Sequence, residues 1–136
     1  MAKRTWQILV VAGVLRRDGK ILICQRRKGD RHEFKWEFPG GKVEPRESPK
    51  RALARELEEE LGIQARIGGE ILRYEHTYPQ GTAILLMFYM VLDFDGEPQN
   101  LAFHAMKWES PENLTGYDFL DGDVDFVRRL ASGELE

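Results

Sequence analysis

The feature that most constrains this chain is a 23-residue segment, 41–63, in which glycine, arginine and glutamate stand at fixed spacings. Gly41 is followed after five residues by Glu47. After seven more residues come arginine, glutamate, leucine and three glutamates, at positions 55–60. An ordinary amphipathic helix has no reason to specify so many positions. The segment therefore predicts one particular local structure with a chemical role.

The same segment carries the signals that begin and end a helix. Ser48 suits the N-cap and Pro49 the first helical position, while Gly62 suits the stop after the last turn. At about 100° per residue, one face of this helix collects the apolar residues Ala52, Leu53, Leu57 and Leu61. We therefore expect a helix that ends near residue 61 and packs this stripe against a sheet.

A second face of the predicted helix collects three carboxylates within one turn, those of Glu56, Glu59 and Glu60. Like charges at this spacing repel by roughly a few tenths of a kcal/mol per pair, so we expect a cation to compensate them. Magnesium, with manganese as an alternative, binds a few carboxylates together with the phosphates of its substrate. Arg55 can pair with Glu59 four residues later and hold its rotamer. The alternative, a solvated acidic face, suits Glu58 best.

Composition limits the class of partner. At 136 residues the chain is expected to be one domain, 1–136. Its net charge of −3 gives no basic footprint for a nucleic-acid polymer, so we expect a small phosphorylated ligand held by metal ions and selected arginines. Cys24 lies in an apolar run, and because it is the one cysteine the chain cannot form an internal disulfide. With no signal-like or membrane-spanning stretch, we expect a cytoplasmic monomer or homodimer without a membrane partner.

Hydrophobic patterning predicts alternating strands and helices. The valine-rich run 6–15 is expected to be a strand buried on both faces, which Asp18-Gly19 turns into a second strand at 20–25. The remaining expected elements are a polar loop at 28–35, a short extended piece at 36–38, strands at 64–78, 82–94 and 105–108, and a helix at 121–130. Pro79-Gln80-Gly81 should join two of these strands as a hairpin. We expect an α/β fold, an α/β/α sandwich with a mixed β-sheet.

Together with the run Trp-Glu-Phe-Pro-Gly-Gly-Lys-Val-Glu at 36–44, the segment matches the signature called the Nudix box. Along nearly its whole length the chain resembles Nudix hydrolases of the MutT-like branch, which hydrolyse nucleoside triphosphates to the monophosphate and pyrophosphate. The resemblance implies the fold given above and a magnesium-dependent pyrophosphohydrolase for nucleotide-pool sanitation. Its substrates would be oxidised dGTP-like or CTP-like nucleotides.

The resemblance also implies metal ligands. Glu56 and Glu60 would be the core ligands, and the carbonyl of Gly40 a further one. Glu59 would be a ligand or the base that activates water.

Three nearby residues would support them. Glu47 would hold the helix start or an outer metal shell, and Arg55 would orient a glutamate. Lys42 would contact phosphate.

Other positions match residues that bind the nucleotide. Arg26 stands where the branch has an arginine that reaches the nucleotide, with a surface charge as the alternative. Phe38 would form part of the base pocket or ordinary core. Asp123 aligns with a residue that faces the base, which is asparagine in the oxidised-guanine enzyme and aspartate in a relative that hydrolyses cytidine triphosphate. An ionised aspartate only accepts hydrogen bonds, which favours the amino group of cytosine. The alternative is that Asp121 or Asp123 caps the last helix.

The chain departs from the branch in two places. The arginine that the oxidised-guanine enzyme carries in its central hairpin has no counterpart at residues 78–81. A loop glutamate before the last strand is replaced by Ala102, with Glu97 or His104 as candidates to take its place. Tyr78 and Pro79 lie near the positions that mark branches acting on ADP-ribose or dinucleoside polyphosphates, but hairpin packing accounts for both.

Two alternatives to the triphosphate hydrolase remain. One is a hydrolase of ADP-ribose or another nucleoside diphosphate derivative. The other is a domain that binds nucleotide without turnover because Ala102 removes a catalytic carboxylate. The intact box glutamates argue against the second, since a domain that only bound nucleotide would have less need of the whole box.

Overall fold

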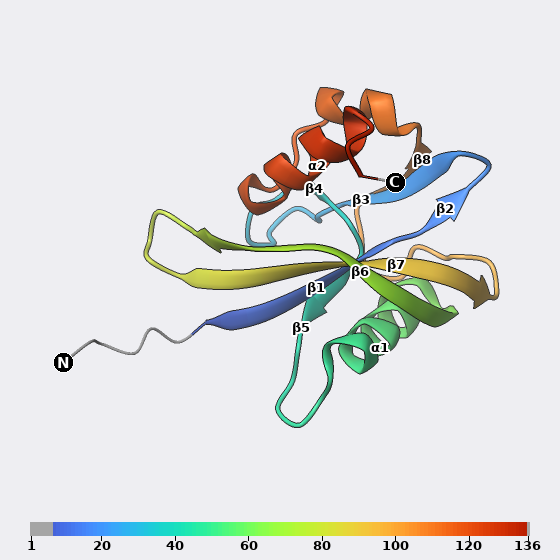
Figure 1. Ribbon diagram of the computed structural model, residues 1–136, viewed down its shortest axis with the longest axis horizontal. Coiled ribbons are helices and arrows are strands. Elements are labelled where there is room, and N and C mark those ends of the chain that lie inside the picture. Colours follow the sequence, from blue (N-terminus) through green and yellow to red (C-terminus); the bar gives the residue numbers. More distant parts are fainter. Residues whose placement is uncertain (1–6, 136) are drawn as a thin grey trace.

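A computed structural model describes residues 7–135 and places two four-stranded sheets at the centre of the molecule (Figure 1). The first sheet has the order β5-β1-β7-β6, with β5 at Gly40–Lys42, β1 at Ile8–Val14, β7 at Ala83–Asp95 and β6 at Gln64–Thr77. It is mixed, because β1 runs parallel to β7 while the other two pairings are antiparallel. In the second sheet β3, at Lys20–Gln25, pairs with β2 at Arg16–Arg17, β4 at Trp36–Glu37 and β8 at Ala105–Glu109.

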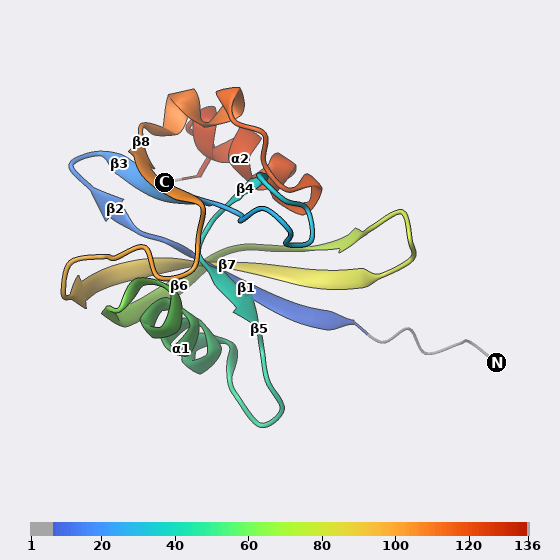
Figure 2. The ribbon, with the colours of Figure 1, turned by 180° about the vertical axis from the view of Figure 1, so that it is seen from behind.

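Helices lie on opposite sides of the strands, as the two views in Figures 1 and 2 show. Helix α1, at Pro49–Leu61, covers one side of the first sheet. Helix α2, at Val124–Ala131, lies on the other side with two short 3-10 helices, η1 at Pro111–Gly116 and η2 at Asp121–Asp123. The predicted α/β fold with a mixed sheet is confirmed, although the strands divide into two sheets where one was expected.

Each helical layer has its own apolar core. The stripe predicted on α1 is fully buried and packs on the odd-numbered face of β7, which includes Met87 and Tyr89. The even-numbered face, with Leu86 and Phe88, packs against α2, and the rings of Phe88 and Phe126 stack 3.8 Å apart. The side chains of β7 thus contribute to both cores, because successive side chains of a strand point to opposite faces of the sheet.

The first strand differs from its prediction. It begins at Ile8, and Trp6 lies outside the described residues. Burial on both faces starts only at Val11, and Leu9 is 37% exposed. Both edges of β1 are taken by β5 and β7, so β1 cannot pair with the strand that follows it. The predicted Asp18-Gly19 turn is present, with both residues in the left-handed region, but it joins β2 to β3 in the second sheet.

Later elements follow the prediction more closely. The hairpin of β6 and β7 is confirmed with its turn at 78–82, and β8 lies at the expected position. The last helix starts at Val124, three residues later than expected, and buries Phe126, Val127 and Leu130 as predicted. Helix η1 had not been predicted. Cys24 is a buried free thiol. Between residues 7 and 135 no helix is long and apolar enough to cross a membrane.

Candidate active site

A cleft of about 360 Å³ collects most of the predicted site residues. Those that line it are Arg26, Phe38, Gly40, Lys42, Glu56, Glu60 and Asp123. Three more predicted residues, Glu47, Arg55 and Glu59, lie on or beside α1 next to one end of the cleft. The cleft has a carboxylate end, where α1 meets β5, and an apolar end between the β1–β7 pair and the start of α2.

The helix signals read from the sequence orient the carboxylate end. The hydroxyl of Ser48 accepts a hydrogen bond from Arg51 N at 3.2 Å, and Gly62 ends α1 in the left-handed conformation. With α1 set this way, Glu56 and Glu60 face the glycines of β5. Glu60 Oε1 accepts a hydrogen bond from Gly40 N at 3.0 Å.

The two glycines of β5 are required by close approach. A Cβ on Gly41 would lie 2.2 Å from Oε2 of Glu56. A Cβ on Gly40 would lie 2.0 Å from the carbonyl oxygen of Val11, and its φ of +155° is one that residues with a side chain rarely adopt. The Gly-Gly pair therefore lets α1 carry its carboxylates directly against the sheet.

The carboxylate end is short of positive charge. Burial, together with the charges of Glu56 and Glu37, raises the pKa of Glu60 to about 9. Hydrogen bonding from Gly40 only partly offsets this rise. A hard cation with oxygen ligands would remove the repulsion and restore the charge of Glu60, so the donor set fits a divalent metal ion.

Glu59 does not join this pair. Its side chain is 59% exposed and lies 3.3 Å from Nη1 of Arg55. Across residues 7–135, no three histidine, cysteine, aspartate or glutamate side chains are grouped so that they could hold a metal ion by themselves. The structure therefore brings two of the three predicted carboxylates, those of Glu56 and Glu60, to the cleft, and metal binding by Glu59 stays a prediction. Two are enough for magnesium, which completes its shell with water and substrate phosphates.

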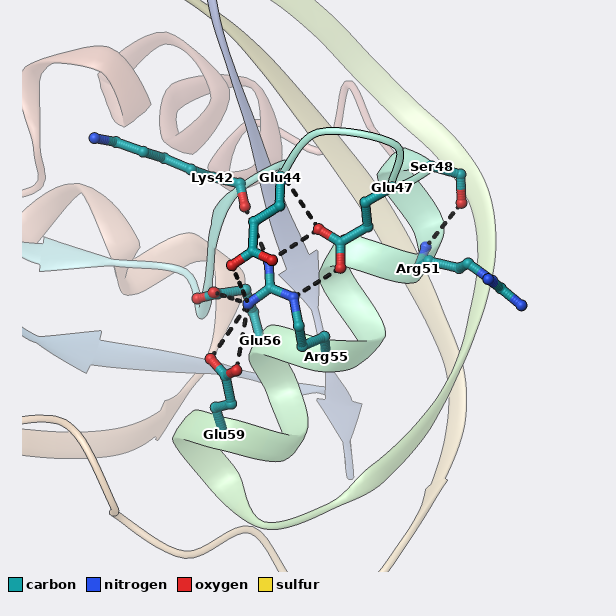
Figure 3. A network of polar contacts seen from close by, with 8 residues as sticks. All are labelled: Lys42, Glu44, Glu47, Ser48, Arg51, Arg55, Glu56 and Glu59. Carbon is teal, nitrogen blue, oxygen red and sulfur yellow. Dashed lines mark hydrogen bonds and ion pairs between the residues drawn. The ribbon is translucent and has the colours of Figure 1, made fainter.

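Arg55 links the carboxylates around the start of α1 (Figure 3). Its Nε and Nη2 donate to the two oxygens of Glu47 at 2.7 and 3.0 Å. Its Nη1 donates to Glu56 Oε1 at 2.7 Å, and the predicted pairing with Glu59 is confirmed. The hydrogen bonds from Arg55 hold the pKa of Glu47 at about 2. Arg55 therefore fixes the rotamer of Glu56 from the side away from the cleft.

Lys42 takes part in the same network through its backbone. Its carbonyl accepts a hydrogen bond from Arg55 Nη2 at 3.1 Å. Its side chain points away from the carboxylates (Figure 3). The phosphate contact expected for this lysine stays a prediction.

At the apolar end, Phe38 belongs both to the core and to the cleft wall, the two alternatives given for it. It is 2% exposed and packs against Phe119 and Phe126, so it is core, and it also lines the cleft. Asp123 is 5% exposed and lies at the N-cap position of α2, but its side chain makes no capping hydrogen bond. Asp121 does not hold the N-cap position of η2, which belongs to Leu120. The helix-cap alternative therefore lacks the contact that would define it.

The environment of Asp123 is unusual for a carboxyl group. Burial raises its pKa well above the ordinary value, and the charge of Glu37 adds to the rise. Arg26 and a hydrogen bond from the Phe38 backbone act in the opposite direction. A buried acid with cleft access is a group whose hydrogen bonds a ligand can complete.

Glu37 is the cleft residue that the sequence patterns missed. Nη1 of Arg26 lies 3.2 Å from both of its oxygens, and burial raises its pKa to about 7. Arg26 Nε also donates to the carbonyl of Arg31 at 2.6 Å. Arg26 is thus a cleft wall residue rather than the surface charge considered above. The available signal was an acidic residue between Trp36 and Phe38 in a short strand.

The loop before β8 does not supply the missing glutamate. Ala102 packs against the apolar cluster around α1. Glu97 forms a two-pronged ion pair with Arg17 at 2.8 and 3.0 Å, and the ring of His104 lies edge-on to Phe34. None of these three loop residues lines the cleft. The expectation that Glu97 or His104 takes the place of the glutamate is therefore unsupported by this arrangement.

Comparison with known proteins extends over almost the whole chain. The family model described as NUDIX domain matches residues 6–130. A CTP pyrophosphohydrolase of Escherichia coli is 43% identical over 120 residues, which is 88% of this chain and 88% of that protein. An 8-oxo-dGTP diphosphatase of Haemophilus influenzae is 36% identical over 124 residues, covering 90% of each. The solution structure of the E. coli ORF135 protein aligns with a TM-score of 0.83 at 39% identity, covering 94% of this chain and 91% of that one.

Proposed function

Because the chain belongs to the Nudix family, whose hydrolases generally use divalent metal ions, we propose that it hydrolyses nucleoside triphosphates to the monophosphate and pyrophosphate with magnesium. One observation carries the proposal. A single cleft joins a buried pair of carboxylates, Glu56 and Glu60, to an apolar end that finishes at the buried Asp123. A nucleotide has the same polarity, with charged phosphates at one end and a flat apolar base carrying polar edges at the other.

Glu56, Glu60 and the carbonyl of Gly40 would hold the metal ion. A magnesium ion bound there would supply neutralisation of phosphate oxygens and a lowered pKa for the water that attacks phosphorus in line. Arg55 keeps Glu56 in place through its hydrogen bond at 2.7 Å. Glu59, exposed beside Arg55, would enter the site as a ligand or would take the proton from water when substrate is bound.

The remaining cleft residues would bind the substrate. Lys42 lies at the carboxylate end and would contact a phosphate by turning its exposed side chain. Arg26, held by Glu37, would reach the nucleotide from the opposite wall. Phe38 would form the apolar wall beside the base, and Asp123 would receive its polar edge.

We propose that CTP-like nucleotides are preferred as substrates over nucleotides that carry an oxidised guanine. The relatives named above act on CTP or on 8-oxo-dGTP, so both are candidates. Asp123 favours the first in its ionised form, which Arg26 and the hydrogen bond from the Phe38 backbone stabilise, because a carboxylate accepts from the exocyclic amino group of cytosine. Turnover of either would place the protein in nucleotide-pool sanitation. Cys24, a buried free thiol, suits a reducing cytosol.

A substrate screen tests this proposal. Purified protein is incubated with magnesium and a panel of normal and oxidised nucleoside triphosphates, and pyrophosphate and phosphate are measured separately. We expect pyrophosphate release, greatest with cytidine nucleotides, and none when a chelator is added. Phosphate release instead would place the attack at another bond. Turnover of ADP-ribose alone would indicate the diphosphate-derivative alternative, and binding without turnover would indicate a non-catalytic domain.

A further inference from the structure

Two aromatic side chains from distant segments meet at the lining of the cleft. His32 belongs to the loop 28–35 between β3 and β4, and Tyr78 directly follows β6. Their rings stack with centroids 5.3 Å apart and planes at 24°. Both residues line the cleft. The stack therefore joins the wall formed by the loop 28–35 to the wall formed by the β6–β7 hairpin.

The backbone that presents His32 is unusual. His32 and Phe34 adopt φ values of +57° and +64°, in the left-handed region. Non-glycine residues rarely adopt this conformation, and a bulky one such as phenylalanine is a genuine outlier. Two such residues within three positions direct the ring of His32 to Tyr78 and the ring of Phe34 to His104, whose centroid is 5.1 Å away. Strain of this kind persists only where the surroundings enforce it, and it concentrates at binding and switch segments.

Hydrogen bonds hold this loop in place. Gln25 Nε2 donates to the carbonyl of Phe34 at 3.0 Å, and Gly29 N donates to a carboxylate oxygen of Glu33 at 2.8 Å. Arg26 donates to the carbonyl of Arg31, the residue before His32. Since Arg26 itself lines the cleft, the position of His32 is coupled to the cleft wall.

Packing contacts also hold the side chain of Tyr78 in place. His76 contacts its ring edge-on at 4.7 Å. A Cβ on Gly122 would lie 3.3 Å from the Tyr78 hydroxyl oxygen, so the ring rests on the residue before Asp123. The stack thus lies beside the buried carboxyl group that ends the cleft.

We propose that His32 and Tyr78 form a roof that closes the apolar end of the cleft over the nucleobase and sets how tightly the base is held. The proposal rests on the proposed function, because it assumes a nucleotide whose base occupies this end. His32 lies outside the box motif. The two rings are too close together to admit a base between them, since stacked rings on both faces of a base need about twice the 3.5 Å contact distance. The roof therefore acts on a base that lies beneath or against it.

The experiment compares His32→Ala with a matched variant, His104→Ala. Both remove an imidazole from an aromatic pair of the same loop, but His104 does not line the cleft. Cytidine monophosphate and 8-oxoguanosine monophosphate serve as probes of base binding, measured by calorimetry with a chelator present, and ribose 5-phosphate serves as the base-free probe. KM and kcat are measured for the corresponding triphosphates with magnesium.

For His32→Ala we expect Kd for both monophosphates, and KM for both triphosphates, to rise about two- to tenfold, the range of a lost aromatic pair. The kcat values and ribose 5-phosphate binding should stay within about twofold, since the phosphate-binding end is unchanged. His32→Phe keeps a ring and should restore binding. His104→Ala should resemble the wild type. In a double-mutant cycle, His32→Ala combined with Tyr78→Ala should weaken binding no more than Tyr78→Ala alone, because one contact is lost in both cases.

Each other outcome overturns the roof. Equal effects of His32→Ala and His104→Ala would show that His32 only shapes the loop. A wild-type affinity in His32→Ala would show that the base does not meet the stack. Additive effects in the cycle would show that the two residues act separately. The proposed function is tested separately, by measurements on the wild-type protein. If the wild type neither bound nor hydrolysed any nucleotide, both the proposed function and the roof would be ruled out.

Discussion

The two ends of the cleft are built in different ways. The carboxylate end comes from residues 40–60, a contiguous stretch in which a glycine pair and one helix place every group. The apolar end is assembled from β1, the loop 28–35, β4, β7, the hairpin end at Tyr78 and the start of α2. Changes at the first end should therefore act on the chemistry through one or two neighbours. Changes at the second end should alter which base is held.

The largest expected effect is at the carboxylate end. Glu60→Gln keeps the shape of the side chain but removes a charge that a metal ion would neutralise, so we expect at least a hundredfold loss of magnesium-dependent hydrolysis. The fold should be retained, because glutamine resembles the protonated form that burial favours. Steady-state rates over a magnesium titration measure the effect. Activity above one tenth of wild type at saturating magnesium would contradict the assignment of Glu60 as a ligand.

Gly41→Ala should weaken the same end through geometry alone. The new Cβ would meet Glu56 Oε2 at 2.2 Å, so the carboxylate must swing away from the cleft. We expect about a tenfold or greater rise in the magnesium concentration needed for half-maximal activity. Gly116→Ala is the matched control, because nothing lies within 4 Å of its Cβ. If both variants behaved alike, close approach to Glu56 would not explain the glycine in the box.

At the apolar end, Asp123→Asn should change the ranking of nucleotides more than the rate of the chemistry. Relative to the ionised carboxylate, the amide keeps one acceptor and adds a donor, so cytidine nucleotides should lose and oxidised guanine nucleotides should gain. A buried mismatch of this kind costs about 1 to 3 kcal/mol, roughly tenfold in relative kcat/KM. Asp121→Asn, at an exposed neighbour, is the control. A uniform fall for all bases would show that Asp123 has only a structural role.

The last effect concerns stability and leaves the wild-type chemistry untouched: the metal-free protein should show a pH dependence of its unfolding free energy. The folded state raises the pKa of Glu60 from 4.5 to about 9, so the folded protein binds more protons than the unfolded chain between these values. The contribution of Glu60 to the free energy of unfolding should therefore be greatest below about pH 4.5. It should fall as the pH rises toward 9, by about 1.4 kcal/mol per pH unit at most. Denaturant unfolding with a chelator at several pH values measures it. Glu60→Gln should flatten the slope, and an unchanged slope would assign it to other groups such as Glu37.

The contrast between the two ends also explains which predictions from sequence succeeded. Ser48, Pro49 and Gly62 act within one turn of the chain, so the bounds of α1 and its buried stripe could be predicted. The orientation of Glu59 could not, because it depends on whether Arg55 reaches Glu47 and Glu56 as well. Glu37 was missed because its burial arises only when β4 pairs with β3 and Asp123 closes the far side.

The sequence by itself determined the family, the bounds of the helix with its acidic face and its buried stripe, and the β6–β7 hairpin. These depend on interactions between near neighbours and on spacings that a linear pattern records. Only the tertiary structure decided the division into two sheets, the burial of Asp123 and the stacking of His32 on Tyr78. The physical reason is that each of these depends on surfaces from segments far apart in the chain, whose contact is fixed by packing of the whole domain and leaves no periodic signal in the sequence.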